Sequence, residues 1–223
     1  MTRPCPGPDY NLRPPKIKPP AGACCTEAHV FGPVSRFPYS EGRGYTPPDA
    51  GIETYLALLD MLGLDRGVIV HGSAHGSDNR ASLDGITTAP DRLRGIAVVD
   101  PDIADDELEK LDAGGMRGIR LSTMLKGGVG SEQLMPMTNR IKYLGWHIVL
   151  HVNDSKEIAE LEDLPRNLPV PIVIDHLSRV RGGQSVDYAG FQGLLRLIWE
   201  TDHIWGRFRA GTGCWTSAHP VTT

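Results

Sequence analysis

GACCTEAHVFGP, residues 22–33, is the stretch of sequence that constrains the fold most. It predicts a first β-strand that ends in polar groups. Side chains on a strand alternate between its two faces, so Glu27 and His29 are expected on the same side. A carboxylate and an imidazole at the end of a strand can hold a divalent ion or polarise a carbonyl group. An ordinary hydrogen-bonded strand end is the alternative interpretation.

The rest of the chain alternates between short β-branched runs and amphipathic segments. Further strands are predicted at 66–71, 93–99, 118–122, 147–151 and 171–176, and another is expected to begin at His203. Helices are predicted at 52–62, 79–87, 105–113, 132–144, 155–161 and 188–200. This alternation indicates parallel βαβ units within one domain.

The positions of polar residues favour a barrel over a doubly wound sheet. They collect at the carboxyl ends of the predicted strands, the catalytic face of a barrel: Glu27, His29, His71, Ser73, Arg120, His151, Asp175 and His176. No G-x-G-x-x-G follows the first strand, and the sequence contains no Walker A motif, so a nucleotide-binding fold is not favoured. We predict an α/β fold, a TIM-type (β/α)8 barrel that begins at residue 21 and ends at residue 205.

Several of these histidines can be interpreted either as structural residues or as site residues. His151 is favoured as a core histidine, and His71 and His75 are favoured as surface residues of a loop. His176, which follows Asp175 after an apolar strand, is favoured as a site residue.

The composition excludes several classes of function. The chain has 223 residues, 40% of them hydrophobic, and a net charge of −4. That charge predicts no nucleic-acid partner, and no apolar run approaches the ~18 residues of a membrane span. The four cysteines have neither metal-site spacing nor the density of a disulfide scaffold. We predict a cytoplasmic protein and leave its oligomeric state open.

The two ends of the chain differ from the middle. Residues 1–20 are proline-rich and predict an extended arm. A complete barrel usually needs about 250 residues, so we expect an incomplete barrel of six to seven strands. Residues 206–223 show no helix or strand period. Because a choice of permissible GC-rich codons lets this tail continue a strand when it is read one base out of register, we hypothesise that it is frameshifted.

Five segments in order carry a family resemblance over roughly residues 21–205. They are residues 22–33, RGYTPP at 43–48, HGSDNR at 75–80, RGIR at 117–120 and IDH at 174–176. The chain resembles the amidohydrolase-related proteins similar to 2-pyrone-4,6-dicarboxylate lactonase. The resemblance implies a hydrolase that opens a lactone of a small carboxylated substrate and needs no cofactor.

The resemblance also implies roles for particular residues. The catalytic residues would be His29 and His176, which polarise the carbonyl group, together with Glu27. The residues that hold substrate carboxylates would be Tyr45, Ser73, Arg120 and Arg179. These roles make chemical sense, because guanidinium groups bind carboxylates bidentately and imidazoles can stabilise an oxyanion.

Departures from the family pattern leave two alternatives open. The family usually has a histidine where this chain has Glu27, and an arginine where it has Lys126. A carboxylate ligates metals, so Glu27, His29 and His176 holding zinc or manganese would indicate a metal-dependent decarboxylase of an aromatic acid. The other alternative is a non-catalytic fragment. Because the family's water-activating Asp lies on an eighth strand, we expect substrate binding to survive better than turnover.

Overall fold

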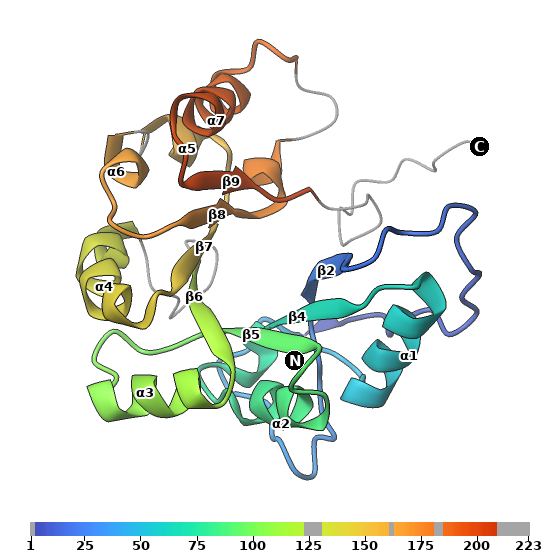
Figure 1. The fold of residues 1–223 in the computed structure, drawn as a ribbon. Coiled ribbons are helices and arrows are strands. Elements are labelled where there is room, and N and C mark those ends of the chain that lie inside the picture. Colours follow the sequence, from blue (N-terminus) through green and yellow to red (C-terminus); the bar gives the residue numbers. More distant parts are fainter. Residues whose placement is uncertain (1–2, 123–130, 161–162, 181–184, 209–223) are drawn as a thin grey trace.

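The fold is a curled parallel sheet with helices on its outer side (Figure 1). The computed structural model describes residues 3–122, 131–160, 163–180 and 185–208. Seven strands form the main sheet in the order of the sequence: β2 (Cys24–Ala28), β4 (Arg66–Val70), β5 (Leu93–Ala97), β6 (Met116–Ser122), β7 (His147–His151), β8 (Ile172–Ile174) and β9 (Ile204–Gly206). All neighbouring pairs are parallel. The predicted incomplete TIM-type barrel is confirmed in this form.

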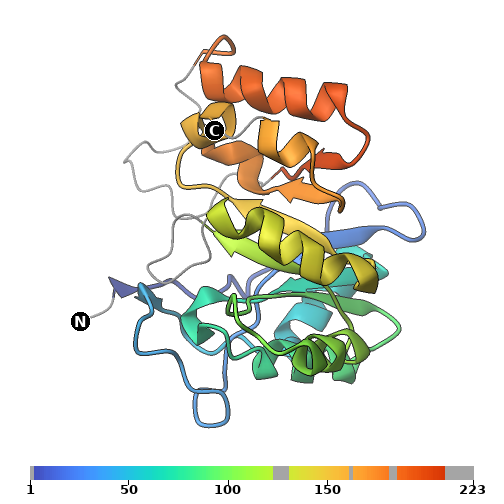
Figure 2. The same ribbon diagram turned by 90° about the vertical axis from the view of Figure 1, so that its left-hand side faces the viewer.

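The helices cover the convex side of the sheet. They are α1 (Ile52–Leu62), α2 (Arg80–Thr88), α3 (Asp105–Ala113), α4 (Leu134–Ile141), α5 (Lys156–Glu160), α6 (Asp163–Arg166) and α7 (Ala189–Glu200). Figure 2 looks onto this outer side and shows α4 in yellow in front of the strands and α7 in orange above them. The concave side and the carboxyl ends of the strands are thus left for a site.

Local patterns explain where the helices form. In α1 the buried residues Ile52, Tyr55 and Leu59 recur at helical spacing, so one face packs on the sheet. The helix ends at Gly63, whose φ of 70° is the left-handed conformation that glycine adopts without a steric penalty. In α7, a Cβ on Gly190 would lie 2.4 Å from the carbonyl oxygen of Ser155, so only glycine permits this close approach.

Register across the sheet brings the polar strand ends together. Arg120 on β6 is opposite Val149 on β7, and Ser122 is opposite His151. β6 and β7 are almost completely buried, as expected for parallel strands that are covered on both faces. The carboxyl ends of β6, β7 and β8 therefore form one edge, where the polar side chains meet.

Several elements differ from the sequence-based expectation. The strand predicted at 171–176 ends at Ile174, because residues Asp175–Arg179 form a tight helical turn. α6 was not predicted. A short parallel pair, β1 (Arg3–Pro4) with β3 (Tyr45–Thr46), lies partly within the predicted arm. None of the helices in the described part of the chain combines the length and apolarity needed to cross a bilayer.

The predicted boundaries of the arm and the tail stay predictions. Gly206, the first residue of the predicted tail, is the last residue of β9, and Arg207 is buried. Residues 209–223, which carry most of the frameshift hypothesis, lie outside the described residues, as does Lys126.

Candidate active site

An ionised carboxylate lies between two arginines at the end of β8. Asp175 is completely buried. Its Oδ2 accepts a hydrogen bond of 3.0 Å from Nη2 of Arg120, and its Oδ1 accepts one of 2.9 Å from Nε of Arg207. Burial alone would raise the pKa of Asp175, but the charges of Arg207 and Arg120 together hold that pKa below its usual value. The two cations thus keep the carboxylate charged.

His176 lies beside two carboxylates. Its Nδ1 is 3.2 Å from Oδ1 of Asp175 and 3.6 Å from Oε2 of Glu27. Glu27 also approaches Nε of Arg207, at 3.5 Å. Carboxylates next to Nδ1 favour a proton on that nitrogen, which places the lone pair of the neutral ring on Nε2. The negative charges of both carboxylates would also stabilise the protonated form of the ring.

An unusual backbone turn presents His176. Residues His176, Leu177, Ser178 and Arg179 all have positive φ, between 48° and 58°. Each non-glycine residue in this conformation costs about 1–2 kcal/mol. The turn is held by a hydrogen bond from the Leu177 amide to the Arg207 carbonyl oxygen, 3.1 Å. Strain of this kind persists where the surrounding structure imposes it, often at functional sites.

His151, at the end of β7, contacts the same cluster. Nη2 of Arg120 is 2.8 Å from its Nδ1, and its ring meets the ring of His176 edge-on at 5.3 Å. Burial, and then the charge of Arg120, lower the pKa of His151 to about 3. The ring is therefore neutral at ordinary pH. Its contacts with Arg120 and His176 connect this buried histidine to the charged cluster.

His29 lies just beyond the end of β2 and points its Nδ1 at β4. That nitrogen is 2.7 Å from the carbonyl oxygen of Val70, so it donates, and the ring packs against Phe31 at 5.9 Å. The pairing of β2 with β4 shifts register between Cys25 and Ala28. This irregularity interrupts the strict alternation from which a shared face for Glu27 and His29 was expected.

The remaining predicted substrate-binding residues flank this cluster. Ser73 Oγ donates to Tyr45 Oη at 3.4 Å. Burial raises the pKa of Tyr45, whereas the hydrogen bond from Ser73 and the charge of Arg120 oppose that rise. The charge of Arg179 is among those that lower the pKa of His151. Tyr45, Ser73, Arg120 and Arg179 thus all lie in or beside one charged region.

The interpretation of His71 and His75 as surface residues is wrong. They are 0% and 3% exposed. Nδ1 of His71 is 2.9 Å from Ser82 Oγ, and Nε2 is 3.1 Å from the Gly76 carbonyl oxygen. Burial, and then His75, lower the pKa of His71 to about 3. The hydrogen bonds of His71 to Ser82 and Gly76 therefore stabilise the turn Ser73–His75.

Arg207 is a residue of this charged cluster that the sequence did not reveal. It lies in the aperiodic segment after the last predicted strand, where no local pattern marks it. Besides Asp175, its guanidinium donates to the carbonyl oxygen of Thr26 on β2 at 2.9 Å. β2 and β9 are the two outer strands of the sheet, so Arg207 connects opposite edges. Long-range contacts of this kind require the folded structure.

A group of possible metal ligands occurs at this site. Ligand atoms of His151, Asp175 and His176 lie within 4.8 Å of one another, a group that shares only His176 with the predicted metal set. The residues do not fit a cation in this arrangement. Both Asp175 oxygens bind guanidinium groups, and Nδ1 of His151 accepts from Arg120. A divalent ion would have to displace these cations.

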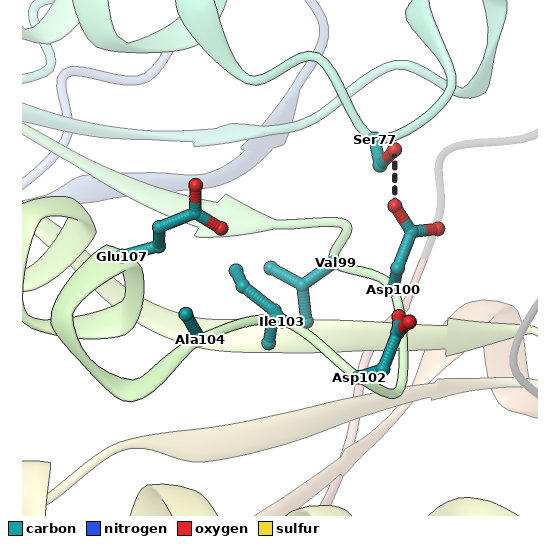
Figure 3. Close-up of a pocket in the computed structure, with 7 residues that line it drawn as sticks. All are labelled: Ser77, Val99, Asp100, Asp102, Ile103, Ala104 and Glu107. Carbon is teal, nitrogen blue, oxygen red and sulfur yellow. Dashed lines mark hydrogen bonds between the residues drawn. The ribbon is translucent and has the colours of Figure 1, made fainter.

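A separate cavity of about 360 Å³ lies where β5 leads into α3 (Figure 3). It is lined by Ser77, Val99, Asp100, Asp102, Ile103, Ala104 and Glu107, and Ser77 Oγ donates to Asp100 at 2.8 Å. Its carboxylates would repel an anionic substrate. The cationic cluster around Arg120 is therefore the better candidate for carboxylate binding.

Stability should fall as pH drops from about 6.5 towards 3. His71 and His151 titrate at 6.5 ordinarily and at about 3 in the fold. Between these values the unfolded chain binds more protons, so each histidine removes about 1.4 kcal/mol of stability per pH unit. Urea unfolding at pH 7, 6 and 5 should show this decline. Equal free energies of unfolding at all three values would contradict the buried neutral histidines.

Comparisons with known proteins agree with the fold. The family described as Amidohydrolase (Amidohydro_2) matches residues 25–222. A 2-pyrone-4,6-dicarboxylate hydrolase from Comamonas testosteroni is 37% identical over 88% of this chain and 65% of its own length. A 4-sulfomuconolactone hydrolase from Rhizobium radiobacter is 38% identical over 91% of this chain and 68% of its own. The chain thus spans about two thirds of these relatives.

A solved structure has a similar fold. The crystal structure of a probable 2-pyrone-4,6-dicarboxylic acid hydrolase from Acinetobacter baumannii, with citric acid bound, superimposes with a TM-score of 0.72 and 28% identity. The match covers 83% of this chain and 69% of that one. The family match extends over most of the sequence, and both the fold and the relatives agree with it. The chain belongs to the amidohydrolase family.

Proposed function

We propose that this chain hydrolyses the lactone ring of a small carboxylated substrate of the 2-pyrone-4,6-dicarboxylate kind. The observation that carries the proposal is the buried group of Arg120, Asp175 and His176 at the carboxyl ends of β6 and β8. It combines an arginine that can bind an anionic substrate with a histidine that lies beside two carboxylates. The names of the relatives supply the substrate class.

Binding is assigned to the cationic side of the cluster. Arg120 and Arg179 would hold carboxylates of the substrate, and the hydroxyl groups of Tyr45 and Ser73 would add neutral hydrogen bonds. Arg120 already has a partner in Asp175, which neutralises part of its charge. The three positive charges of Arg120, Arg179 and Arg207 exceed the two negative charges of Asp175 and Glu27, so a dianionic substrate would meet a net positive charge.

Hydrolysis is assigned to His176, with Glu27 and His29 in support. Nε2 of His176 takes a proton from water as its oxygen attacks the lactone carbonyl carbon. The tetrahedral oxyanion then collapses, the ring C–O bond breaks, and His176 returns the proton to the departing ring oxygen. The new carboxylic acid ionises and releases one proton to solvent. Glu27 and Asp175 stabilise the imidazolium, as carboxylates do in other hydrolase sites.

His29 is the further catalytic residue of the proposal. Its Nδ1–H is held by the Val70 carbonyl oxygen, which places the lone pair of the neutral ring on Nε2. The ring could therefore accept a proton or, once protonated, polarise the carbonyl group. We propose that hydrolysis proceeds without a resident metal, in the cytoplasm.

The metal-dependent decarboxylase of an aromatic acid stays the second candidate. Its support is the closeness of ligand atoms of His151, Asp175 and His176, which could hold a cation only if Arg120 and Arg207 moved away from Asp175. It predicts that the purified protein holds stoichiometric zinc or manganese. It also predicts release of carbon dioxide instead of lactone opening.

Ligand stabilisation tests the proposed binding site. At a hundredfold excess over Kd, 2-pyrone-4,6-dicarboxylate should stabilise the fold by about 2.7 kcal/mol, measured as a rise in Tm. Tyr45→Phe removes one hydroxyl from the site and should weaken binding by about 1.5–3 kcal/mol, because that hydroxyl would bind a charged group. Tyr143→Phe, at a residue that is 56% exposed, is the matched control. Equal binding by both variants would remove Tyr45 from the site.

A further inference from the structure

One buried nitrogen of the cluster has no role in the function proposed so far. Nε2 of His151 is covered from solvent, and among the described residues it has no hydrogen-bond partner. The residue as a whole keeps 9% of its surface exposed. Buried polar atoms of folded proteins are nearly always hydrogen-bonded, and exceptions call for an explanation.

The other ring nitrogen determines where the proton of His151 lies. Nη2 of Arg120 is 2.8 Å from Nδ1, and Ser122 Oγ is 3.4 Å from it. A guanidinium group has N–H donors and no acceptor, so Nδ1 must accept. The neutral ring then carries its proton on Nε2. The atom without a partner is therefore a hydrogen-bond donor, fixed in that form by Arg120.

This proton position is the reverse of the one that metal binding requires. A metal binds an unprotonated imidazole nitrogen, and the other ring nitrogen usually donates to a carboxylate or carbonyl oxygen. In His151 the nitrogen next to Arg120 accepts instead, and Nε2 is protonated. The ring is thus prepared to bind an oxygen atom rather than a cation.

We propose that His151 is a catalytic residue whose Nε2–H binds the lactone carbonyl oxygen as negative charge develops on it. This inference rests on the lactone hydrolysis proposed above. The ring of His151 meets that of His176 edge-on at 5.3 Å, so the proposed general base and this donor are neighbours. Water activated at His176 attacks the carbonyl carbon, and the oxyanion forms beside His151. The proton stays on Nε2, which only donates.

Nitrogen-15 NMR of the wild-type chain tests the proton position without substrate. The ¹⁵N shifts of imidazole separate protonated from unprotonated nitrogens, and the His151 signals are those missing from the spectrum of His151→Asn. We expect an unprotonated Nδ1 and a protonated Nε2 at neutral pH. A spectrum with the proton on Nδ1 would overturn the proposal.

Two variants separate the donor from the acceptor. His151→Asn keeps an acceptor oxygen near the position of Nδ1 but has no donor at the position of Nε2. His151→Gln places an amide N–H near the position of Nε2. Loss of one oxyanion donor typically lowers kcat by about 10²–10³-fold. We expect that loss in the Asn variant, an unchanged KM, and a kcat within about tenfold of wild type in the Gln variant. Equal kcat values for wild type and the Asn variant would overturn the donor role.

Zinc titration completes the test. Wild type and His151→Asn should bind zinc equally weakly, as measured by metal analysis after dialysis. Stoichiometric zinc in the wild type that is lost in the variant would overturn the proposal and make His151 a metal ligand. If the wild type opens no lactone, the proposed function fails by itself. The spectrum and the zinc titration still decide whether His151 is a donor.

Discussion

Replacing Arg120 with alanine is expected to lower the free energy of unfolding by about 1.5–3 kcal/mol, because the buried carboxylate of Asp175 loses one of its two arginine partners and keeps only Arg207. The side chains of Arg120 and Asp175 are only 6% and 0% exposed. Charges so far from water cannot be resolvated without unfolding. Urea denaturation measures the loss, and it should be accompanied by a changed titration of His151, which loses its neighbouring cation.

Arg36→Ala is the matched control for this loss. Arg36 also binds a carboxylate, that of Asp84, but the two side chains are 62% and 35% exposed. Exposed pairs contribute about 0–1 kcal/mol, so this variant should unfold nearly as the wild type does. If both variants lost similar amounts of unfolding free energy, burial of the Arg120–Asp175 pair would make no difference to stability.

Replacing His176 with glutamine is expected to lower kcat for lactone hydrolysis by about 10²–10⁴-fold, the usual contribution of a general base. Glutamine keeps a polar side chain of similar size, so the fold and the binding of substrate should change little. Base consumption at constant pH measures turnover, because each lactone opened releases one proton.

His203→Gln controls for the loss of an imidazole in itself. His203 precedes β9, and its Nε2 is 3.2 Å from the carbonyl oxygen of Pro165, so it lies at the opposite end of the strand from Arg207. This variant should hydrolyse lactone at close to the wild-type rate. A His176 variant that is equally active would refute the role given to that residue.

The architecture could be predicted because its signals are local. The limits of α1, α3 and β7 coincide with those predicted, since each is set by neighbouring apolar residues and by a glycine or a polar residue at the end. The gathering of polar groups at strand ends also followed from the sequence. Parallel strands end on the same side of a sheet, so their terminal residues had to meet.

The detailed site could not be predicted because its contacts are long-range. Arg207 meets Asp175 across 32 positions of sequence and Thr26 across 181. No periodicity encodes such a contact. The tautomers of His29 and His151 depend on which atom faces each nitrogen, and the left-handed turn at His176 runs against local preference. Such features arise from tertiary packing.

The most direct test of the central claim is the incubation of the purified protein with 2-pyrone-4,6-dicarboxylate, first after treatment with chelator and then with added zinc or manganese. Base consumption and evolved carbon dioxide are followed together. The proposed function predicts one proton released per substrate molecule, no carbon dioxide, and a rate that chelator leaves unchanged. An inert lactone, together with carbon dioxide released from an aromatic acid only when metal is present, would contradict it.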